Sequence, residues 1–311
     1  MTRVAGVDCG TNSLRLLIAD VASDGALVDV VREMHIVRLG EGVDRTGKFS
    51  DEALGRTFAV LDDYAALVRS HGVERVRMVA TSASRDVSNR EAFVAGVRDR
   101  LGVDPDVVTG DEEAQLSFAG ATRELHGTAV PAPYLVCDIG GGSTEFVLGD
   151  DDGMRAARSV DIGCVRMTER HLHDNPPTAA QVAAATDDVD AAIAVAAETV
   201  PLRTAQTLIG LAGSVTTVVA LALGLSAYDP ARIHHTRISV SEVAKVTEML
   251  LAMTHVERAA LPVMHPGRVD VIGAGALVLN RVMVRGGFDS VVASEHDILD
   301  GIALSAAGLL S

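Results

Sequence analysis

The sequence predicts an α/β protein that is built from two domains of similar plan. Three observations lead to this prediction: a length of 311 residues, an alternation of strand-like and helix-like segments, and an internal repeat. At roughly 150 residues per domain, the length suits two domains with a sizeable core each. Strands that alternate with helices are typical of the α/β class. We therefore expect two series of elements, one in each half of the chain.

The first series opens with a hairpin. Apolar runs at residues 4–7 and 14–18 flank the turn-like segment 9–13, and residues 28–39 continue as strand material. Ser50, followed by two acidic residues, predicts the start of a helix that runs to Leu67. The expected later elements are a strand over 76–80, a helix over 89–101, a short strand over 107–108 and a helix over 112–125.

The pattern restarts in the middle of the chain. Residues 134–150 repeat the plan of residues 4–20 without a gap: a strand ending in aspartate, a glycine turn, a serine, and a returning strand that ends on aspartate. A connector with two prolines, residues 128–133, precedes the restart. Such a repeat predicts two related domains. The expected boundaries are 1–120 for the first domain and 121–296 for the second.

Charge and cysteine content narrow the function classes. With 27 basic and 42 acidic residues, the net charge of −15 repels nucleic acids and anionic membrane surfaces, and we expect neither as a partner. The three cysteines, Cys9, Cys137 and Cys164, form no Cys-x-x-Cys pair. This pattern favours buried, reduced thiols in a cytoplasmic protein.

One segment is apolar enough to raise the question of a membrane span. Residues 208–225 carry no charge and are in principle long enough to cross a bilayer. Gly210, Gly213 and several hydroxyl residues interrupt the run. We interpret it as a buried strand, a glycine turn and a buried helix.

The two repeated turns have the composition of phosphate sites. After a strand that ends in aspartate, a turn of Gly, Ser and Thr points backbone N–H groups and hydroxyls into one concavity, which suits phosphate oxygens. A plain glycine-rich hairpin with acidic flanks is the alternative for either turn alone, but two copies in register favour phosphate binding. The candidate ligands are Gly10, Thr11, Asn12 and Ser13 in the first turn, and Gly140, Gly141, Gly142, Ser143 and Thr144 in the second.

The second turn also has the residues for a metal ion. Asp138 and Glu145 bracket it, so the hairpin is expected to bring both carboxylates to one end of the sheet. Mg²⁺ is characteristically bound by one or two carboxylates together with substrate phosphates and water, so we expect Mg²⁺ (or Mn²⁺) as cofactor. A third loop, residues 210–214, follows a strand and opens a helix, where Gly213 and Ser214 are anion-binding candidates. Its alternative role is close helix–strand packing.

Two further patterns are set aside. Residues 42–48 have Walker A spacing, but Phe49 stands where the Mg²⁺-binding Ser or Thr is required, so we reject a P-loop there. His171 and His173 are expected on different helix faces, and the pair at 234–235 has no third ligand at a recognisable spacing. The sequence therefore argues against zinc.

Five segments, taken together and in order, resemble the exopolyphosphatase/guanosine pentaphosphatase (Ppx/GppA) family. The resemblance covers almost the whole chain, which looks like the short form without a C-terminal HD-type domain. It implies two actin-like (ribonuclease H-like) domains with a phosphate-binding cleft between them, a homodimer, and a C-terminal helix at 297–311 that packs back on the first domain. The segments that carry the resemblance are 8–13, 80–86, 110–114, 138–145 and 210–214.

The resemblance also assigns roles to two side chains. Glu113 matches the family's general base, and Arg85 matches a cleft arginine that grips phosphate. The alternatives are a helix N-terminal carboxylate for Glu113 and a surface cation for Arg85. Arg15 and Arg166 are further candidates for anion contact, although a solvated helix surface is the more ordinary interpretation of Arg166.

Together these features predict a Mg²⁺-dependent exopolyphosphatase, which hydrolyses terminal phosphoanhydride bonds of inorganic polyphosphate and releases orthophosphate. The alternative with the same residues is a guanosine pentaphosphate (pppGpp) 5′-phosphohydrolase. More remote alternatives are an actin-like small-molecule kinase and a non-catalytic phosphate or nucleotide sensor.

Overall fold

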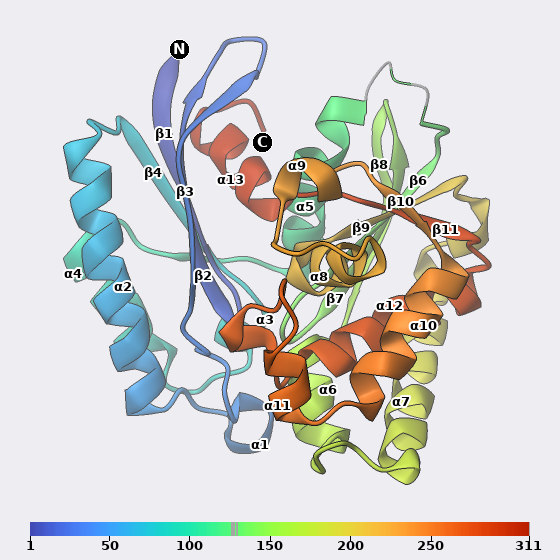
Figure 1. The fold of residues 1–311 in the computed structure, drawn as a ribbon. Helices are drawn as coiled ribbons and strands as arrows, with labels where there is room; N and C mark the ends of the chain where they lie inside the picture. The colour runs from blue at the N-terminus through green and yellow to red at the C-terminus, as the bar shows by residue number, and fades with distance from the viewer. Residues whose placement is uncertain (126–127, 129, 311) are drawn as a thin grey trace. The chain divides into compact units, whose positions relative to one another are not determined.

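The computed structural model describes residues 1–125, 128 and 130–310. The chain divides into two compact units, each with its own β-sheet (Figure 1). The first unit comprises residues 1–120 together with the segment from residue 298 onward, and the second comprises residues 121–297.

The first unit is built on a five-stranded sheet in the order β3-β2-β1-β4-β5. Its first three strands form an antiparallel meander, and β4 and β5 run parallel to β1. The strands are β1 (Thr2–Cys9), β2 (Ser13–Val21), β3 (Leu27–Ile36), β4 (Arg75–Ala80) and β5 (Asp106–Val107). The helices are α1 (Val43–Thr46), α2 (Asp51–Ser70), α3 (Ser82–Arg85), α4 (Arg90–Leu101), α5 (Gly110–Thr122, which runs on into the second unit) and α13 (Ile298–Ala306).

Helices cover both faces of this sheet (Figure 1). Leu61 and Tyr64 of α2 and Phe93 of α4 pack on one face in a single apolar cluster. On the other face, Leu299 and Ala303 of α13 pack against β1 and β2. The predicted helix start is confirmed, since Ser50 Oγ accepts a hydrogen bond from the backbone N–H of Ala53 at 3.1 Å.

The second unit has a six-stranded sheet in the order β10-β11-β9-β6-β7-β8. The run β8-β7-β6-β9-β11 repeats the order of the first sheet, and β10 is added antiparallel at the edge. The strands are β6 (Tyr134–Ile139), β7 (Thr144–Asp150), β8 (Gly153–Val160), β9 (Thr207–Leu211), β10 (Arg237–Ser239) and β11 (Ser290–Ala293).

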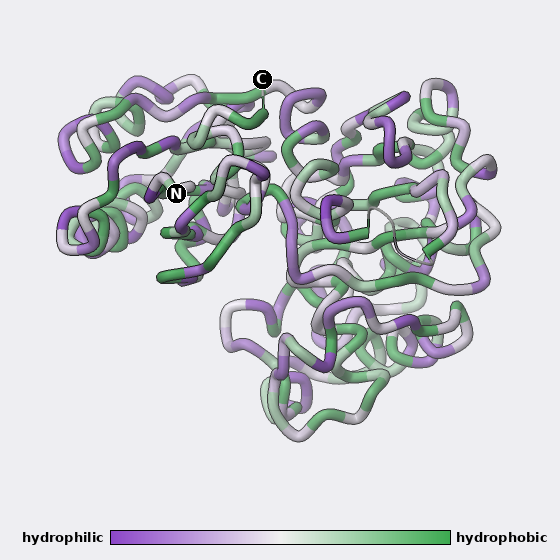
Figure 2. The backbone as a smooth tube through the Cα atoms, turned by 90° about the horizontal axis from the view of Figure 1, so that it is seen from above, coloured by the Kyte–Doolittle hydropathy of each residue, from purple (hydrophilic) through white to green (hydrophobic). Residues whose placement is uncertain are grey.

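The second unit also contains most of the helices. Hydrophobic and hydrophilic segments alternate along the chain (Figure 2), and a large apolar cluster of buried residues forms the core of this unit. Its α-helices are α6 (Cys164–His171), α7 (Ala179–Thr199), α8 (Ala212–Ala222), α9 (Pro230–Ile233), α10 (Val240–Ala252), α11 (His255–Ala259) and α12 (Ile272–Gly286). Short 3₁₀ turns are η1 (Arg123–Leu125), η2 (Leu202–Thr204) and η3 (Pro266–Arg268).

The predicted fold class is confirmed: the protein is α/β, and both sheets contain the ribonuclease H-like strand order. The uncharged segment at 208–225 is strand β9 followed by helix α8, and no helix of the described residues is long and apolar enough to cross a membrane. Cys9, Cys137 and Cys164 are free and buried, as predicted. Burial raises the pKa of all three thiols, so they are poor nucleophiles.

Some element boundaries differ from the prediction. The third strand ends at Ile36 rather than residue 39, because the backbone of residues 37–40 leaves the sheet to hydrogen-bond the first turn. The helix expected over 112–125 is an α-helix only to Thr122 and then tightens into a 3₁₀ turn. Within the predicted connector at 128–133, residue 129 lies outside the described residues.

Candidate phosphate-binding and catalytic residues

The first turn, residues 10–13, joins β1 to β2 and is held by its backbone. The N–H of Gly10 donates to the carbonyl of Ser13 at 3.0 Å and closes the turn. The carbonyls of Thr11 and Asn12 both accept N–H groups from the neighbouring loop at 37–40. Because C=O and N–H point in opposite directions across a trans peptide, the N–H groups that follow these two carbonyls point away from that loop.

Side chains of the first turn are tied down as well. Asp8, at the end of β1, lies opposite Arg15 of β2 in the strand register and accepts two hydrogen bonds from its guanidinium, at 2.7 and 2.9 Å. Thr11 is buried, and its hydroxyl has no hydrogen-bond partner among the described residues. The backbone N–H groups of Asn12 and Ser13 are therefore the clearest anion donors that this turn offers.

The second turn, residues 140–143, has the same closure. The N–H of Gly140 donates to the carbonyl of Ser143 at 3.1 Å. Three turn carbonyls face helix α6, whose first N–H groups they accept. The contacts are Gly163 N to Gly142 O (3.2 Å), Cys164 N to Gly140 O (2.9 Å), Val165 N to Gly141 O (2.8 Å) and Arg166 Nε to Gly142 O (2.8 Å).

This carbonyl arrangement creates a donor nest. Since the carbonyls of residues 140–142 are turned toward α6, the N–H groups of residues 141–143 point the other way. None of these three N–H groups donates to a residue in the described part of the chain. Successive unpaired backbone N–H groups form an anion-binding concavity. The close approach requires glycine, because a Cβ on Gly163 would collide with the backbone of Gly141.

Two carboxylates lie beside this nest. Asp138 and Glu145 are directly opposite each other in the β6–β7 register, and both are buried. Side chains opposite each other in an antiparallel pair project from the same face. Glu145 Oε1 accepts hydrogen bonds from the hydroxyls of Ser143 and Ser159, each at 2.7 Å. The hydroxyl of the fifth predicted ligand, Thr144, donates instead to the Ile162 carbonyl at 2.9 Å.

The third predicted loop starts helix α8. Gly213 and Ser214 lie in its first turn, and Ser214 is buried. Arg268, from the distant turn η3, lies against Gly213 so closely that a Cβ there would overlap its guanidinium. Arg268 Nη1 also donates to Thr217 Oγ1 at 3.3 Å. The structure thus adds a cation to this loop.

Arg85 and Glu113 come together within the first unit. Arg85 Nη1 donates to Glu113 Oε2 at 2.7 Å and to the Val108 carbonyl at 3.0 Å. The Glu113 side chain is 10% exposed and that of Arg85 is 25% exposed. Arg90 fixes the end of α3 by donating to the carbonyls of Ser84 and Arg85, both at 2.7 Å. Nε and Nη2 of Arg85 make no hydrogen bond to any described residue, and remain available to an anion.

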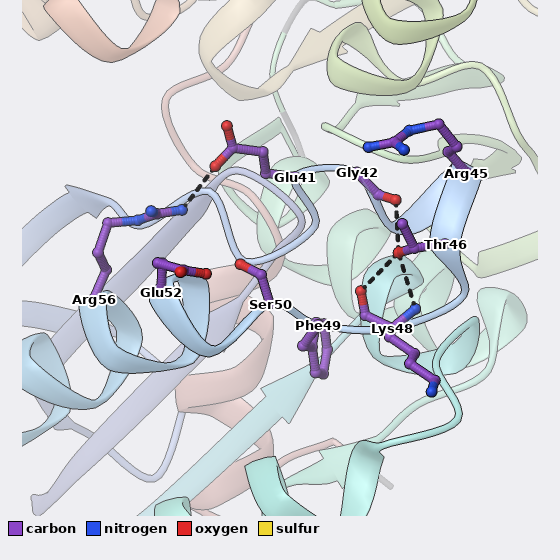
Figure 3. Close-up of a pocket in the computed structure, with 9 residues that line it drawn as sticks. All are labelled: Glu41, Gly42, Arg45, Thr46, Lys48, Phe49, Ser50, Glu52 and Arg56. Carbon is purple, nitrogen blue, oxygen red and sulfur yellow. Dashed lines mark hydrogen bonds and ion pairs between the residues drawn. The ribbon is translucent and has the colours of Figure 1, made fainter.

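The segment with Walker A spacing forms a different structure, shown in Figure 3. It contains the short helix α1 and lines an open pocket of about 520 Å³ with the start of α2. Thr46 Oγ1 donates to the Gly42 carbonyl, and Phe49 is buried in the core. Lys48 is exposed, as predicted.

Sequence reasoning missed or misjudged two cationic residues. Arg166 is buried and bound to the second turn, so the expectation of a solvated helix surface is wrong. The reason is that α6 packs its N-terminus under the turn. Arg268 was not singled out at all, and its distance in sequence from Gly213 leaves no local signal that could have found it.

The strand order and the paired turns define a protein of the actin-like class, in which two related units each open with a hairpin that carries a glycine turn. A family model described as the Ppx/GppA phosphatase family matches residues 17–306. The chain belongs to this family.

Individual relatives agree with this placement. The chain is 53% identical to "Exopolyphosphatase 2" of Mycobacterium tuberculosis, over 99% of both chains. It is 32% identical to "Guanosine-5'-triphosphate,3'-diphosphate pyrophosphatase" of Photobacterium profundum, over 68% of this chain and 42% of that protein. A solved exopolyphosphatase-like protein superposes with a TM-score of 0.95 and 45% identity, covering 99% of this chain and 100% of the other.

Proposed function

We propose that the protein is an exopolyphosphatase, which hydrolyses the terminal phosphoanhydride bond of inorganic polyphosphate and releases orthophosphate. The single observation that carries this proposal is the full-length match, at 53% identity, to a protein named Exopolyphosphatase 2. The site residues supply a chemical route, because the chain combines backbone anion nests with a buried glutamate held by an arginine.

Glu113 is the general base in this proposal. Its carboxylate accepts a proton from the attacking water, the water oxygen bonds to the terminal phosphorus, and the P–O bond to the rest of the chain breaks. The products are orthophosphate and a polyphosphate that is shorter by one unit. The hydrogen bond from Arg85 fixes the orientation of the carboxylate, so that Glu113 acts from one rotamer.

Backbone N–H groups hold the phosphate oxygens. The nest at residues 141–143 offers three donors without a protein partner, and the first turn adds those of Asn12 and Ser13. We assign Nε and Nη2 of Arg85 and the guanidinium of Arg268 to the same task. Cations and neutral donors of this kind allow a protein with a net charge of −15 to bind a polyanion.

Asp138 and Glu145 fit a Mg²⁺ ion. Their donors are carboxylate oxygens, which Mg²⁺ prefers, and they lie opposite each other next to the phosphate nest. When bound, the ion would neutralise developing charge on the phosphate oxygens. The hydroxyls of Ser143 and Ser159 hold Glu145 in place for this role.

The second candidate is a pppGpp 5′-phosphohydrolase. The observation in its favour is the similarity to a guanosine pentaphosphatase over two thirds of the chain. The same base and nests would act on a nucleotide. We also propose, from the family resemblance, a homodimer in the cytoplasm, and the three reduced thiols support that location.

Orthophosphate release tests the proposal. The purified protein is offered long-chain polyphosphate, pppGpp and ATP in parallel, with Mg²⁺ present. We expect release chiefly from polyphosphate, and a loss of about 10²–10⁴-fold in kcat for Glu113→Gln, which is the range for a missing general base. Release chiefly from pppGpp would replace the first candidate with the second, and release from none would favour the sensor.

The neighbouring glutamate is a matched control. Glu112 occupies the same helix turn but pairs with Arg77 at 2.7 Å and is 43% exposed. Glu112→Gln is expected to keep turnover within about twofold of wild type, because an exposed ion pair contributes little. Equal losses in both variants would assign the effect to the helix N-terminus rather than to a base.

A further inference from the structure

Three potential metal ligands meet in the second unit, and none of them is one of the carboxylates assigned to Mg²⁺. They are Glu124 in η1, His234 after α9, and His296 after β11. One ligand atom from each lies within 4.8 Å of the other two. The pair at 234–235 was set aside in the sequence for want of a third ligand, and the fold brings in two.

The distances suit a common cation. Zn²⁺ binds nitrogen and oxygen ligands at about 2.0–2.2 Å, so neighbouring ligand atoms in a tetrahedral site are about 3.3–3.6 Å apart. Glu124 Oε2 lies 3.0 Å from His234 Nε2 and 3.5 Å from His296 Nδ1. The carboxylate therefore lies at one corner of a nearly formed triangle of ligands.

The ligands are partly ordered in advance. His234 stacks on His235 with ring centroids 3.7 Å apart, which restricts its ring plane. Ser294 Oγ accepts the N–H of His296 and donates to its carbonyl, fixing the backbone at the third ligand. The side chains of Glu124, His234 and His296 are 49%, 22% and 34% exposed, so a hydrated ion has access.

We propose that Glu124, His234 and His296 form a binding site for a divalent transition-metal ion of the Zn²⁺ type, with water completing the coordination. Two imidazoles and one carboxylate are a ligand set for Zn²⁺ rather than for Mg²⁺, which prefers oxygen ligands alone. This site is independent of the proposed hydrolase activity.

Binding requires one rearrangement at His234. The backbone N–H of Glu295 donates to Nδ1 of His234 at 3.1 Å, so the neutral ring carries its proton on Nε2 and donates it to Glu124. When a metal ion takes Nε2, this proton moves to Nδ1 and the Glu295 N–H loses its acceptor. We therefore expect weaker binding than in a closed structural zinc site.

Two of the three ligands lie next to the points where the chain crosses between the two units. The chain passes from the first unit to the second between residues 120 and 121, and returns between 297 and 298. Glu124 and His296 lie just inside the second unit at these two passages. A bound ion would tie both connecting segments to the loop at His234, and would stabilise the folded state by mass action.

Zinc titration tests the proposal. The full chain, free of any histidine tag and treated with chelator, is titrated with Zn²⁺ against a chromophoric chelator, with excess Mg²⁺ to fill oxygen sites. We expect one Zn²⁺ per chain, a visible d–d spectrum with Co²⁺, and a Zn²⁺-dependent rise in Tm. Glu124→Gln and His296→Gln are each expected to weaken binding at least about tenfold.

His173→Gln is the matched control, since this exposed histidine makes no described side-chain contact. It is expected to bind Zn²⁺ like wild type. Glu124→Gln and His296→Gln change different segments. If one variant fails to fold, Zn²⁺ binding by the other still tests the proposal. Wild-type protein without saturable binding of one equivalent, or binding retained in both variants, would overturn the proposal.

Discussion

The two glycine turns, residues 10–13 and 140–143, have the same backbone closure, but a different residue lies opposite the aspartate that precedes each turn. Both close with a Gly N–H to Ser carbonyl bond, at 3.0 Å in the first turn and 3.1 Å in the second. In the first, Asp8 lies opposite Arg15; in the second, Asp138 lies opposite Glu145. The position opposite the aspartate thus holds a cation at the first turn and an anion at the second, so the local charge of the two turns differs.

This difference bears on the roles proposed for the two turns, which are anion binding at both and metal binding at the second alone. In the first turn the arginine neutralises the aspartate at 2.7 Å, so the turn offers donors without a strong site for a cation. In the second, two acids lie opposite each other beside the nest, an arrangement that fits the divalent cation proposed above. The elements that hydrogen-bond the turn carbonyls differ too: the start of helix α6 at the second turn, and the loop at 37–40 at the first.

The largest expected effect comes from the glycines that let helix α6 and the loop at 37–40 pack closely against the two turns. Gly163→Ala places a Cβ against the backbone of Gly141, which has no means of moving aside, whereas Gly40→Ala meets mainly the methyl group of Thr11. We expect Gly163→Ala to lower kcat about 100-fold or more through displacement of the nest, and Gly40→Ala to lower it less. Orthophosphate release measures both. Gly55→Ala, in open space on α2, is the control and is expected to leave kcat unchanged.

The next effect concerns the metal ion proposed at the second turn. Glu145→Gln keeps an oxygen that can accept the two serine hydroxyls but removes the charge, so the Mg²⁺ concentration for half-maximal activity is expected to rise about 10–100-fold. Arg15→Gln, at the matching position of the first turn, is expected to leave that concentration unchanged. Equal Mg²⁺ requirements in wild type and Glu145→Gln would remove Glu145 from the metal site.

A stability measurement probes the first turn. Arg15→Ala removes the guanidinium partner of Asp8, whose side chain is 5% exposed, and we expect a loss of about 2 kcal/mol, below the full value for a buried pair because Arg15 is 20% exposed. Urea denaturation gives the free energy of unfolding. Arg98→Ala, which breaks a pair with partners 59% and 57% exposed, is expected to cost under about 1 kcal/mol. Similar losses in both variants would contradict the assigned difference.

The smallest expected effect concerns the third loop, residues 210–214, against which Arg268 lies. Burial, and then Arg268, lower the pKa of His265, whose Nδ1 accepts the N–H of Gly267. The His265 side chain therefore binds a proton more readily in the unfolded chain than in the folded one. Its contribution to the free energy of unfolding is present above about pH 6.5 and is lost as the pH falls through the lower pKa of the folded state. Between pH 7.5 and pH 5.5 we expect this contribution to the free energy of unfolding to fall by less than about 1 kcal/mol in the wild type and to be absent in His265→Asn. Urea denaturation at the two pH values measures the difference.

Local patterns in the sequence were enough to predict the fold class, both glycine turns and the helix that carries Glu113. These features depend on residues close together in the chain. The boundaries that failed, such as the end of β3, depend on hydrogen bonds to a distant turn.

Contacts over long sequence distances escaped prediction. Arg268 beside Gly213, Arg166 beneath the second turn, and Glu124 beside His234 join residues from separate elements, and only folding makes them neighbours. The pairing of Arg85 with Glu113 was also not visible, although each was a candidate alone. The cleft between the domains and the homodimer stay predictions.

The return of α13 to the first sheet has a consequence for synthesis on the ribosome. Val4 and Leu17 complete their apolar cluster only with Leu299, Ala303 and Leu304. The second unit is continuous in sequence and can fold as soon as its last strand emerges, whereas the first unit must wait until α13 is made before this part of β1 and β2 is covered. The unit translated first is thus the last to be finished, and its nascent chain is the one that most needs protection from aggregation.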